Sequence, residues 1–109
     1  MRDLAQLLKG NTDVLILSLL ESEPMYGYQM IKELERRSQG FFHLGEGTLY
    51  PALHRLERGK LVVGRWRRLE GGQERRYYSL TEAGDRRLEE QMTAWARFSS
   101  AVNLIIKPA

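Results

Sequence analysis

Residues 46–59 of this 109-residue chain read EGTLYPALHRLERG, and this stretch decides the fold. Its large apolar side chains recur at positions i, i+4 and i+7: Leu49, Leu53 and Leu56. That spacing places them on one face of a helix. Proline is tolerated in the first turn of a helix, and Gly59 suits the left-handed residue that ends one. The stretch therefore predicts a helix over residues 48–58.

The opposite face of this helix carries polar, aromatic and basic side chains: Thr48, Tyr50, Pro51, His54, Arg55 and Arg58. We expect Tyr50 to point outward beside the basic residues. A helix with such an outer face fits the major groove of DNA, which is about 12 Å wide.

Two strand-like runs follow, over residues 61–69 and 73–80, and the Gly71-Gly72 pair between them is a strong hairpin signal. Thr81 then caps a last helix over residues 82–107. Its apolar stripe steps by threes and fours: Leu88, Met92, Trp95, Phe98 or Ser99, Val102, Ile105 or Ile106. A helix this long spans roughly 39 Å, more than the rest of one chain could cover. The stripe therefore indicates that two chains assemble.

Three segments precede the central helix. Leu4, Leu7 and Leu8 have helical spacing within residues 3–9. A second helix runs from the capping residues 11–13 to about Ser22, and a third is predicted over residues 28–37 and ends at Gly40.

This order is that of a winged helix-turn-helix, mostly α with a small β-hairpin. We expect a DNA-binding domain over residues 1–80, including the N-terminal helix 3–9, and a C-terminal dimerisation helix over residues 81–107.

The charge is concentrated on two of these elements. The whole chain has a net charge of only +3, yet residues 54–76 contain eight basic and three acidic residues. Seven of the eight are arginine, whose planar guanidinium group suits forked contacts with phosphate or guanine. The excess falls on the central helix and the hairpin, which favours nucleic acid as the partner.

Several other classes are excluded or disfavoured. The chain has no cysteine, which excludes a disulfide scaffold and thiolate metal sites. His43, Glu46 and His54 do not have the spacing of metal ligands, and no catalytic or nucleotide-binding motif is present. We therefore expect no catalytic residue, metal or cofactor. The longest apolar run, residues 14–20, is far shorter than the roughly 20 residues of a membrane span, and no signal peptide is visible. A cytoplasmic location is expected.

Three motifs resemble those of the PadR-like transcriptional regulators. MYGYQMI at 25–31 resembles the YGYxI motif, EGTLYPALHRLE at 46–57 resembles the GTLYPALxRLE recognition helix, and RRYYSLTEAG at 75–84 resembles RxYYxLTxxG. They occur in the family's order. The resemblance implies a homodimeric repressor that binds an inverted-repeat operator in double-stranded DNA and is released by a small molecule or another signal.

The resemblance also implies where DNA is contacted. The positions that correspond to DNA-binding residues are Tyr26, Thr48, Tyr50, Pro51, His54, Arg55, Gly72, Gln73 and Arg75. His54 occupies a variable position of the motif. Many relatives have a basic wing tip, whereas residues 70–74 here contain two acids. An alternative is that the backbone is contacted by Arg67, Arg68, Arg75 and Arg76.

The single last helix is similar to the short branch of the family, in which the last and N-terminal helices form the dimer. Trp95 matches a tryptophan that stacks on planar drugs in some multidrug-responsive members. By position, the effector pocket would be lined by Leu7, Val14, Ser18, Met92, Trp95, Phe98 and Ser99. The alternative is that Trp95 only packs the dimer interface, where aromatic residues are enriched.

A winged helix can also bind protein or RNA, because fold alone does not determine function. A protein-binding version has no need of arginines on the wing, and RNA readers stack bases on exposed aromatic side chains. Beyond Tyr50 the sequence offers few obvious ones, so DNA is the favoured partner.

Overall fold

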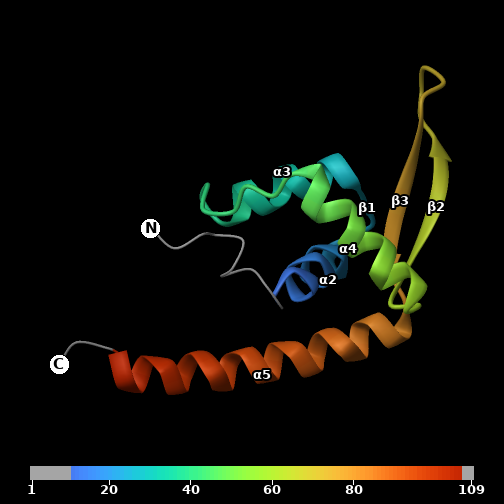
Figure 1. Ribbon diagram of the computed structural model, residues 1–109. Coiled ribbons are helices and arrows are strands. Elements are labelled where there is room, and N and C mark those ends of the chain that lie inside the picture. The colour runs from blue at the N-terminus through green and yellow to red at the C-terminus, as the bar shows by residue number, and fades with distance from the viewer. Residues whose placement is uncertain (1–10, 107–109) are drawn as a thin grey trace.

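The computed structural model describes residues 11–106, and Figure 1 shows the arrangement of its elements. The helices α2 (Thr12–Ser22), α3 (Gly27–Arg37) and α4 (Glu46–Arg58) precede a β-hairpin and a long last helix. The hairpin strands are β2 (Val62–Arg68) and β3 (Glu74–Leu80), the last helix is α5 (Glu82–Ile106), and a short strand β1 (Met25–Tyr26) precedes α3. The predicted winged helix is confirmed. The predicted helix over residues 3–9 lies outside the described residues.

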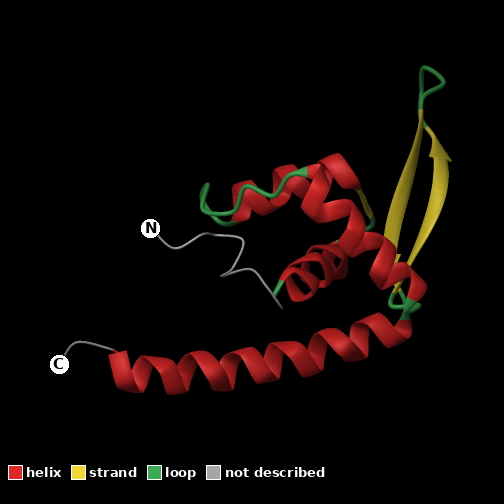
Figure 2. Cartoon of the chain, in the orientation of Figure 1, coloured by secondary structure: helices red, strands yellow, loops and turns green. Residues whose placement is uncertain are grey.

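The three strands form one antiparallel sheet in the order β1-β3-β2, drawn yellow in Figure 2. Met25 and Tyr26 pair with Tyr78 and Tyr77 of β3. The sequence predicted only the hairpin, because a strand of two residues has no periodicity of its own and is defined by its distant partner. The hairpin turns where predicted, at Gly71 and Gly72, whose φ angles of 89° and 86° favour glycine.

The leucine stripe of α4 forms the centre of the core. Leu49 and Leu53 are fully buried, and Leu56 is 2% exposed. They meet apolar side chains from α2, α3, the sheet and the first turns of α5: Ile16, Leu17, Met30, Val62, Tyr78 and Leu88. Burying each such leucine contributes about 1.5–3 kcal/mol, so this stripe fixes α4 against the rest of the domain.

The end of α4 differs from the sequence prediction. Gly59 was expected to be left-handed, but its φ is −80°, and Lys60 takes the positive φ of 63° instead. The Leu61 and Lys60 N–H groups donate to the carbonyls of Leu56 and Glu57, which is the Schellman pattern. In this pattern the left-handed residue directly follows the C-cap residue of the helix. The C-cap is Gly59, so the left-handed conformation falls on Lys60.

The first turn of α5 is attached to the hairpin as predicted. The Thr81 hydroxyl oxygen accepts a hydrogen bond from the Gly84 N–H at 3.0 Å and so caps the helix. A Cβ atom on Gly84 would overlap the carbonyl oxygen of Leu61, so the helix starts directly against the chain that enters β2.

Beyond Leu88, α5 leaves the core. It runs the length of the domain in Figure 1, in a molecule measuring 57 × 31 × 21 Å. Large apolar side chains on this part are exposed to solvent in the single chain: Met92, Trp95, Phe98, Leu104, Ile105 and Ile106. None of the helices within residues 11–106 combines the length and apolar composition that crossing a membrane requires.

Candidate nucleic-acid interface

The outer face of α4 presents three of the predicted DNA-contacting side chains to solvent. Thr48, Pro51 and His54 are all exposed. They are held there because the opposite face of the helix is the buried leucine stripe. Two other predicted contacts on α4, Tyr50 and Arg55, are placed differently from the expectation.

Tyr50 is half-buried rather than projecting freely. Its ring lies over the first residue of α3, and a Cβ atom on Gly27 would overlap the Tyr50 hydroxyl group. Burial raises the pKa of this hydroxyl above its usual value, and Glu46 and Tyr78 raise it further. The group is therefore neutral at physiological pH and remains a hydrogen-bond donor. Gly27 and Tyr50 belong to different sequence motifs, and their close approach explains why position 27 is a glycine.

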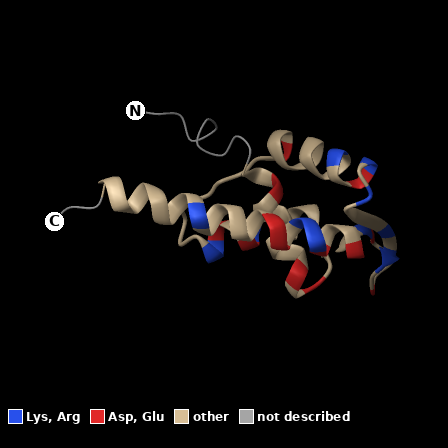
Figure 3. Ribbon diagram, turned by 90° about the horizontal axis from the view of Figure 1, so that it is seen from below, with Lys and Arg blue, Asp and Glu red and all other residues tan. Residues whose placement is uncertain are grey.

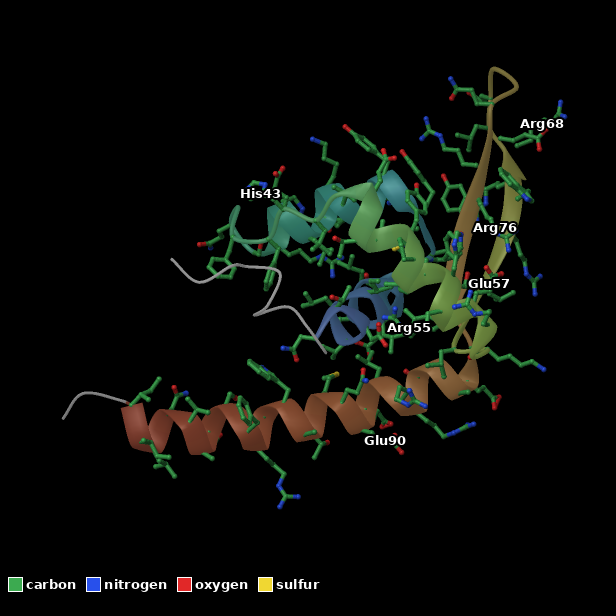
Figure 4. The ribbon with its side chains drawn as sticks, viewed as in Figure 1. His43, Arg55, Glu57, Arg68, Arg76 and Glu90 are labelled. Carbon is green, nitrogen blue, oxygen red and sulfur yellow. The ribbon has the colours of Figure 1, made fainter. Side chains whose placement is uncertain are left out.

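Arg55 is turned towards α2. Its guanidinium group donates a hydrogen bond to Asp13, with Nη2 and Oδ1 2.5 Å apart. Figure 4 shows Arg55 beside α2, whereas the wing side chains lie on the other side of α4. The structure thus brings Arg55 onto the flank of the outer face and gives it a carboxylate partner.

Three arginines of the wing lie over tyrosine rings, and Arg67 and Arg75 make the closest contacts, whereas the Arg76 guanidinium carbon is 5.7 Å from the centre of the Tyr78 ring. The Arg75 guanidinium carbon lies 4.3 Å from the centre of the Tyr26 ring, and that of Arg67 lies 4.1 Å from Tyr77. The strand register explains this ladder, because Tyr26 is opposite Tyr77 and Arg67 is opposite Arg75. The tyrosine ring supports each guanidinium group through a cation–π contact, and the N–H groups of the guanidinium stay available for a phosphate.

The other two wing arginines of the predicted backbone set have carboxylate partners. Arg68 pairs with Glu74 across the hairpin at 3.2 Å, and Arg76 pairs with Glu57 of α4 at 2.5 Å. Within residues 11–106, Arg65, Arg67 and Arg75 form no such ion pair. The eight basic residues counted in the sequence are therefore not equivalent.

A notch between α3, α4 and the wing collects several predicted residues. Tyr26, Tyr50, His54 and Arg75 line it, together with Tyr28, Trp66, Glu74, Arg76 and Tyr78. Gly72 and Gln73 lie in the turn between the two hairpin strands and do not line the notch.

Sequence reasoning missed Tyr28 and Trp66, whose side chains are 55% and 65% exposed. The signal for Tyr28 was its place in the first motif. Trp66 gave no such signal, because an aromatic residue in a strand is usually taken for a packing residue.

The predicted effector residues are divided between two neighbouring hollows. Val14, Ser18, Met92 and Trp95 line a hollow of about 600 Å³, together with Asn11, Leu15, Phe41 and Phe42. Phe98 lies with Trp95 in the other hollow, and their ring centres are 5.9 Å apart. Ser99, one turn after Trp95, lines neither hollow, and its hydroxyl donates to the Ala96 carbonyl. Leu7 lies outside the described residues. Phe41 and Phe42 were missed, because a loop pair carries no periodicity.

No cluster of three or more potential metal-ligating side chains is found in the part of the chain that the structure describes. His43 pairs with Glu35 through Nδ1 at 2.7 Å, and His54 is on the outer face of α4. The two histidines therefore lie on different surfaces of the protein and are not paired with each other.

The model of the PadR-like family of transcriptional regulators matches residues 16–90. This chain belongs to that family. A PadR-like transcriptional regulator from Bacillus cereus is 33% identical and superimposes with a TM-score of 0.83, over 95% of this chain and 99% of that one. A transcriptional regulator from Clostridium thermocellum is 27% identical, with a TM-score of 0.85 over 94% and 99%.

Curated relatives agree. The chain is 37% identical over 79 residues to the transcriptional regulator Rv3488 of Mycobacterium tuberculosis, covering 72% of this chain and 70% of that one. It is 35% identical over 81 residues to the transcriptional regulator YqjI of Escherichia coli, covering 74% of this chain but only 37% of that longer protein. The chain is therefore a transcriptional regulator of the PadR family, whose members bind DNA.

Proposed function

We propose that this PadR-family chain is a homodimeric repressor that binds an inverted-repeat operator through α4 and the wing, and that a planar aromatic small molecule releases it. The observation that carries the DNA-binding part is the notch. It gathers the start of α3, the outer face of α4 and the arginine-bearing wing on one side of the molecule.

Each element has a distinct role in this proposal. His54, Thr48 and Pro51 on the exposed face of α4 enter the major groove, because an α-helix fits there. The stacked Arg67 and Arg75 bind backbone phosphates, which positions the protein without reading sequence. Gly72 and Gln73 at the tip lie where a wing approaches the minor groove.

The dimer is supported by the apolar part of α5. A 25-residue helix that buries only its first turns leaves Trp95, Phe98 and Ile106 in water, and a second copy of the same helix would cover them. Its C-terminal end carries no charged residue and is tan in Figure 3. Two chains would hold their α4 helices about one DNA turn apart, roughly 34 Å, which suits an inverted repeat.

The effector site is supported by the hollow beside α5. Trp95 and Phe41 are both large aromatic side chains with more than half of their surface exposed, and they line the same space. A flat aromatic molecule between them would bury surface that water now covers. A variant with Trp66→Phe keeps Trp95 as the sole tryptophan, so its fluorescence should be quenched as proflavine is added.

Selection of bound duplexes from random DNA tests the DNA-binding part. A palindromic winner is expected, bound about 10³-fold or more tightly than random duplex. Affinity should fall steeply with salt, because bound arginines displace counterions from the phosphates. Absence of duplex binding at low salt, or preference for single-stranded RNA, would contradict the proposal.

A matched pair of arginine variants tests the interface. Arg75→Ala should weaken binding to all duplexes and lower the log–log salt slope by about 1, as the loss of one phosphate contact does. Arg97→Ala on α5 removes the same charge from a distant exposed position, and it should leave both quantities unchanged. Equal effects of the two variants would show that only net charge matters.

A further inference from the structure

One carboxylate oxygen joins the recognition helix to both strands of the wing. Oε2 of Glu57, near the end of α4, accepts hydrogen bonds from the Gly64 N–H of β2 at 3.1 Å and from Nη2 of Arg76 of β3 at 2.5 Å. Figure 4 shows Glu57 and Arg76 next to each other between α4 and the strands. Glu57 is the last residue of the second sequence motif.

The local backbone is built for this contact. In the sheet order, β2 is an edge strand, so part of its N–H groups have no strand partner. The Glu57 carboxylate accepts the hydrogen bond from the free N–H group of Gly64. A Cβ atom at position 64 would lie 2.6 Å from Nε of Arg76, so a larger residue there would displace the end of this arginine side chain. The glycine lets Arg76 cross β2 and reach the helix.

The contact lies where the wing leaves the core. Val62 is buried at the base of β2, Val63 and Gly64 are half-buried, and residues 65–68 are exposed. Beyond Gly64, β2 therefore has little packing against the body of the protein, whereas β3 is still half-buried from Arg75 to Tyr77 and pairs with β1 at Tyr77 and Tyr78. The direction of the free part of the wing therefore depends on how firmly β2 is held at Gly64 and β3 at Arg76, in addition to the pairing of β3 with β1.

We propose that Glu57 is a positioning residue that sets the angle between the wing and α4, and with it the spacing between the bases read by α4 and the phosphates bound by the wing. This inference rests on the proposed DNA-binding function. The proposal gives Arg76 a role different from that of Arg67 and Arg75. Arg76 holds the wing against α4 through Glu57, whereas Arg67 and Arg75 bind the phosphates.

The first test needs no DNA. Glu57→Gln keeps the size of the side chain and an oxygen for the Gly64 N–H but removes the charge that holds Arg76. Hydrogen exchange at the Gly64 amide is expected to speed up about tenfold, because an amide oxygen accepts a hydrogen bond more weakly than a carboxylate and is no longer held in place by Arg76. Arg76→Gln should do the same. The double variant should lose no more than either single change, because both break one interaction.

The second test uses the best duplex from the selection and a version with one base pair inserted between the segment read by α4 and the segment protected by the wing. Wild-type affinity should fall about tenfold on insertion, the loss typical of one mismatched position. Glu57→Gln should bind the original duplex more weakly and distinguish the two duplexes less than threefold, because a freer wing reaches both spacings. A purely stabilising residue would not change this ratio.

Glu33→Gln is the matched control. Glu33 is also a carboxylate held by arginines, Arg36 and Arg37, but it lies on α3 outside the interface. It should leave the Gly64 exchange rate and the spacing ratio at their wild-type values.

Unchanged exchange at Gly64 in Glu57→Gln and Arg76→Gln would overturn the proposal, and so would equal weakening on both duplexes with the ratio retained. If the wild-type protein binds no duplex, the proposed function fails on its own, and the exchange rates still decide whether Glu57 fixes the wing.

Discussion

At the level of single residues, the contact between Gly27 and Tyr50 links two motifs that are far apart in the sequence. A methyl group at position 27 would overlap the Tyr50 ring, which must then leave its place in the notch. We expect Gly27→Ala to lower the free energy of unfolding by about 1–3 kcal/mol, the usual cost of overpacking, as measured by urea denaturation.

Gly47→Ala is the control for this change. Position 47 is also helical, but a Cβ atom there meets nothing within 4 Å. It should be neutral or stabilising by up to about 1 kcal/mol, since alanine is the better helix former. If both variants lose the same stability, the Tyr50 contact is not what requires the glycine.

Arg55 and Asp13 give a second prediction at this scale. Asp13 neutralises Arg55 and draws it towards α2, so the carboxylate competes with any phosphate for the same guanidinium group. We expect Asp13→Asn to tighten binding to DNA of any sequence a few-fold and to steepen the salt slope by about 1. The surface pair itself contributes at most about 1 kcal/mol to stability. A salt slope equal to that of the wild type would show that Arg55 does not reach a phosphate.

At the level of elements, the last turns of α3 hold a carboxylate between two arginines. Hydrogen bonds from Arg36 and Arg37 lower the pKa of Glu33 from 4.5 to about 2. A lowered pKa means that the pairing stabilises the fold above pH 4.5, where the carboxylate is also charged in the unfolded chain. This stabilisation is lost as the pH falls from about 4.5 to about 2.

Urea denaturation between pH 5 and pH 2.5 measures this loss. The wild-type protein should lose more stability across that range than Glu33→Gln, which has no charge to lose. The difference should be small and should shrink in high salt, because the pair is at the surface. A variant that follows the wild-type curve throughout would contradict the prediction.

The helices and the hairpin could be predicted from the sequence because each carries its own signal. The leucine stripe of α4, the cap at Thr81 and the glycine pair at 71–72 act over a few residues, so local pattern is enough. Strand β1 could not be found in this way, because it exists only through pairing with β3. At the end of α4, residue type alone predicts that Gly59 is left-handed. The hydrogen bonds that close this helix instead place the left-handed conformation at Lys60.

The candidate site could be predicted as a surface but not as a set of contacts. Counting charges located the basic elements correctly. It could not show that Arg76 is held by Glu57, 19 residues away, or Arg55 by Asp13, 42 residues away. Such pairs depend on how the elements pack, and a count of charges treats a paired arginine like a free one.

At the level of the whole molecule, the exposed apolar face of α5 and the arginine-bearing wing lie on different parts of the chain. In Figure 1, α5 runs along the side of the domain away from the wing tip. An assembly through α5 would therefore leave both wings free. A shift at the α5 interface would change the distance between the two α4 helices, so both half-sites would be affected at once.

The final prediction concerns this assembly, and α5 supplies its own control. Ile106 lies on the same side of α5 as Leu88 and Trp95 and continues their apolar stripe. Leu104 is also apolar and is 87% exposed, but it lies on the opposite side of the helix. Light scattering should give a dimeric mass for the wild-type protein. Ile106→Asp should shift the mass towards the monomer, because burying a carboxylate in an apolar interface is costly. Leu104→Asp makes the same chemical change outside the stripe and should remain dimeric. A monomeric wild-type protein, or equal dissociation by both variants, would show that the stripe is not the dimer interface.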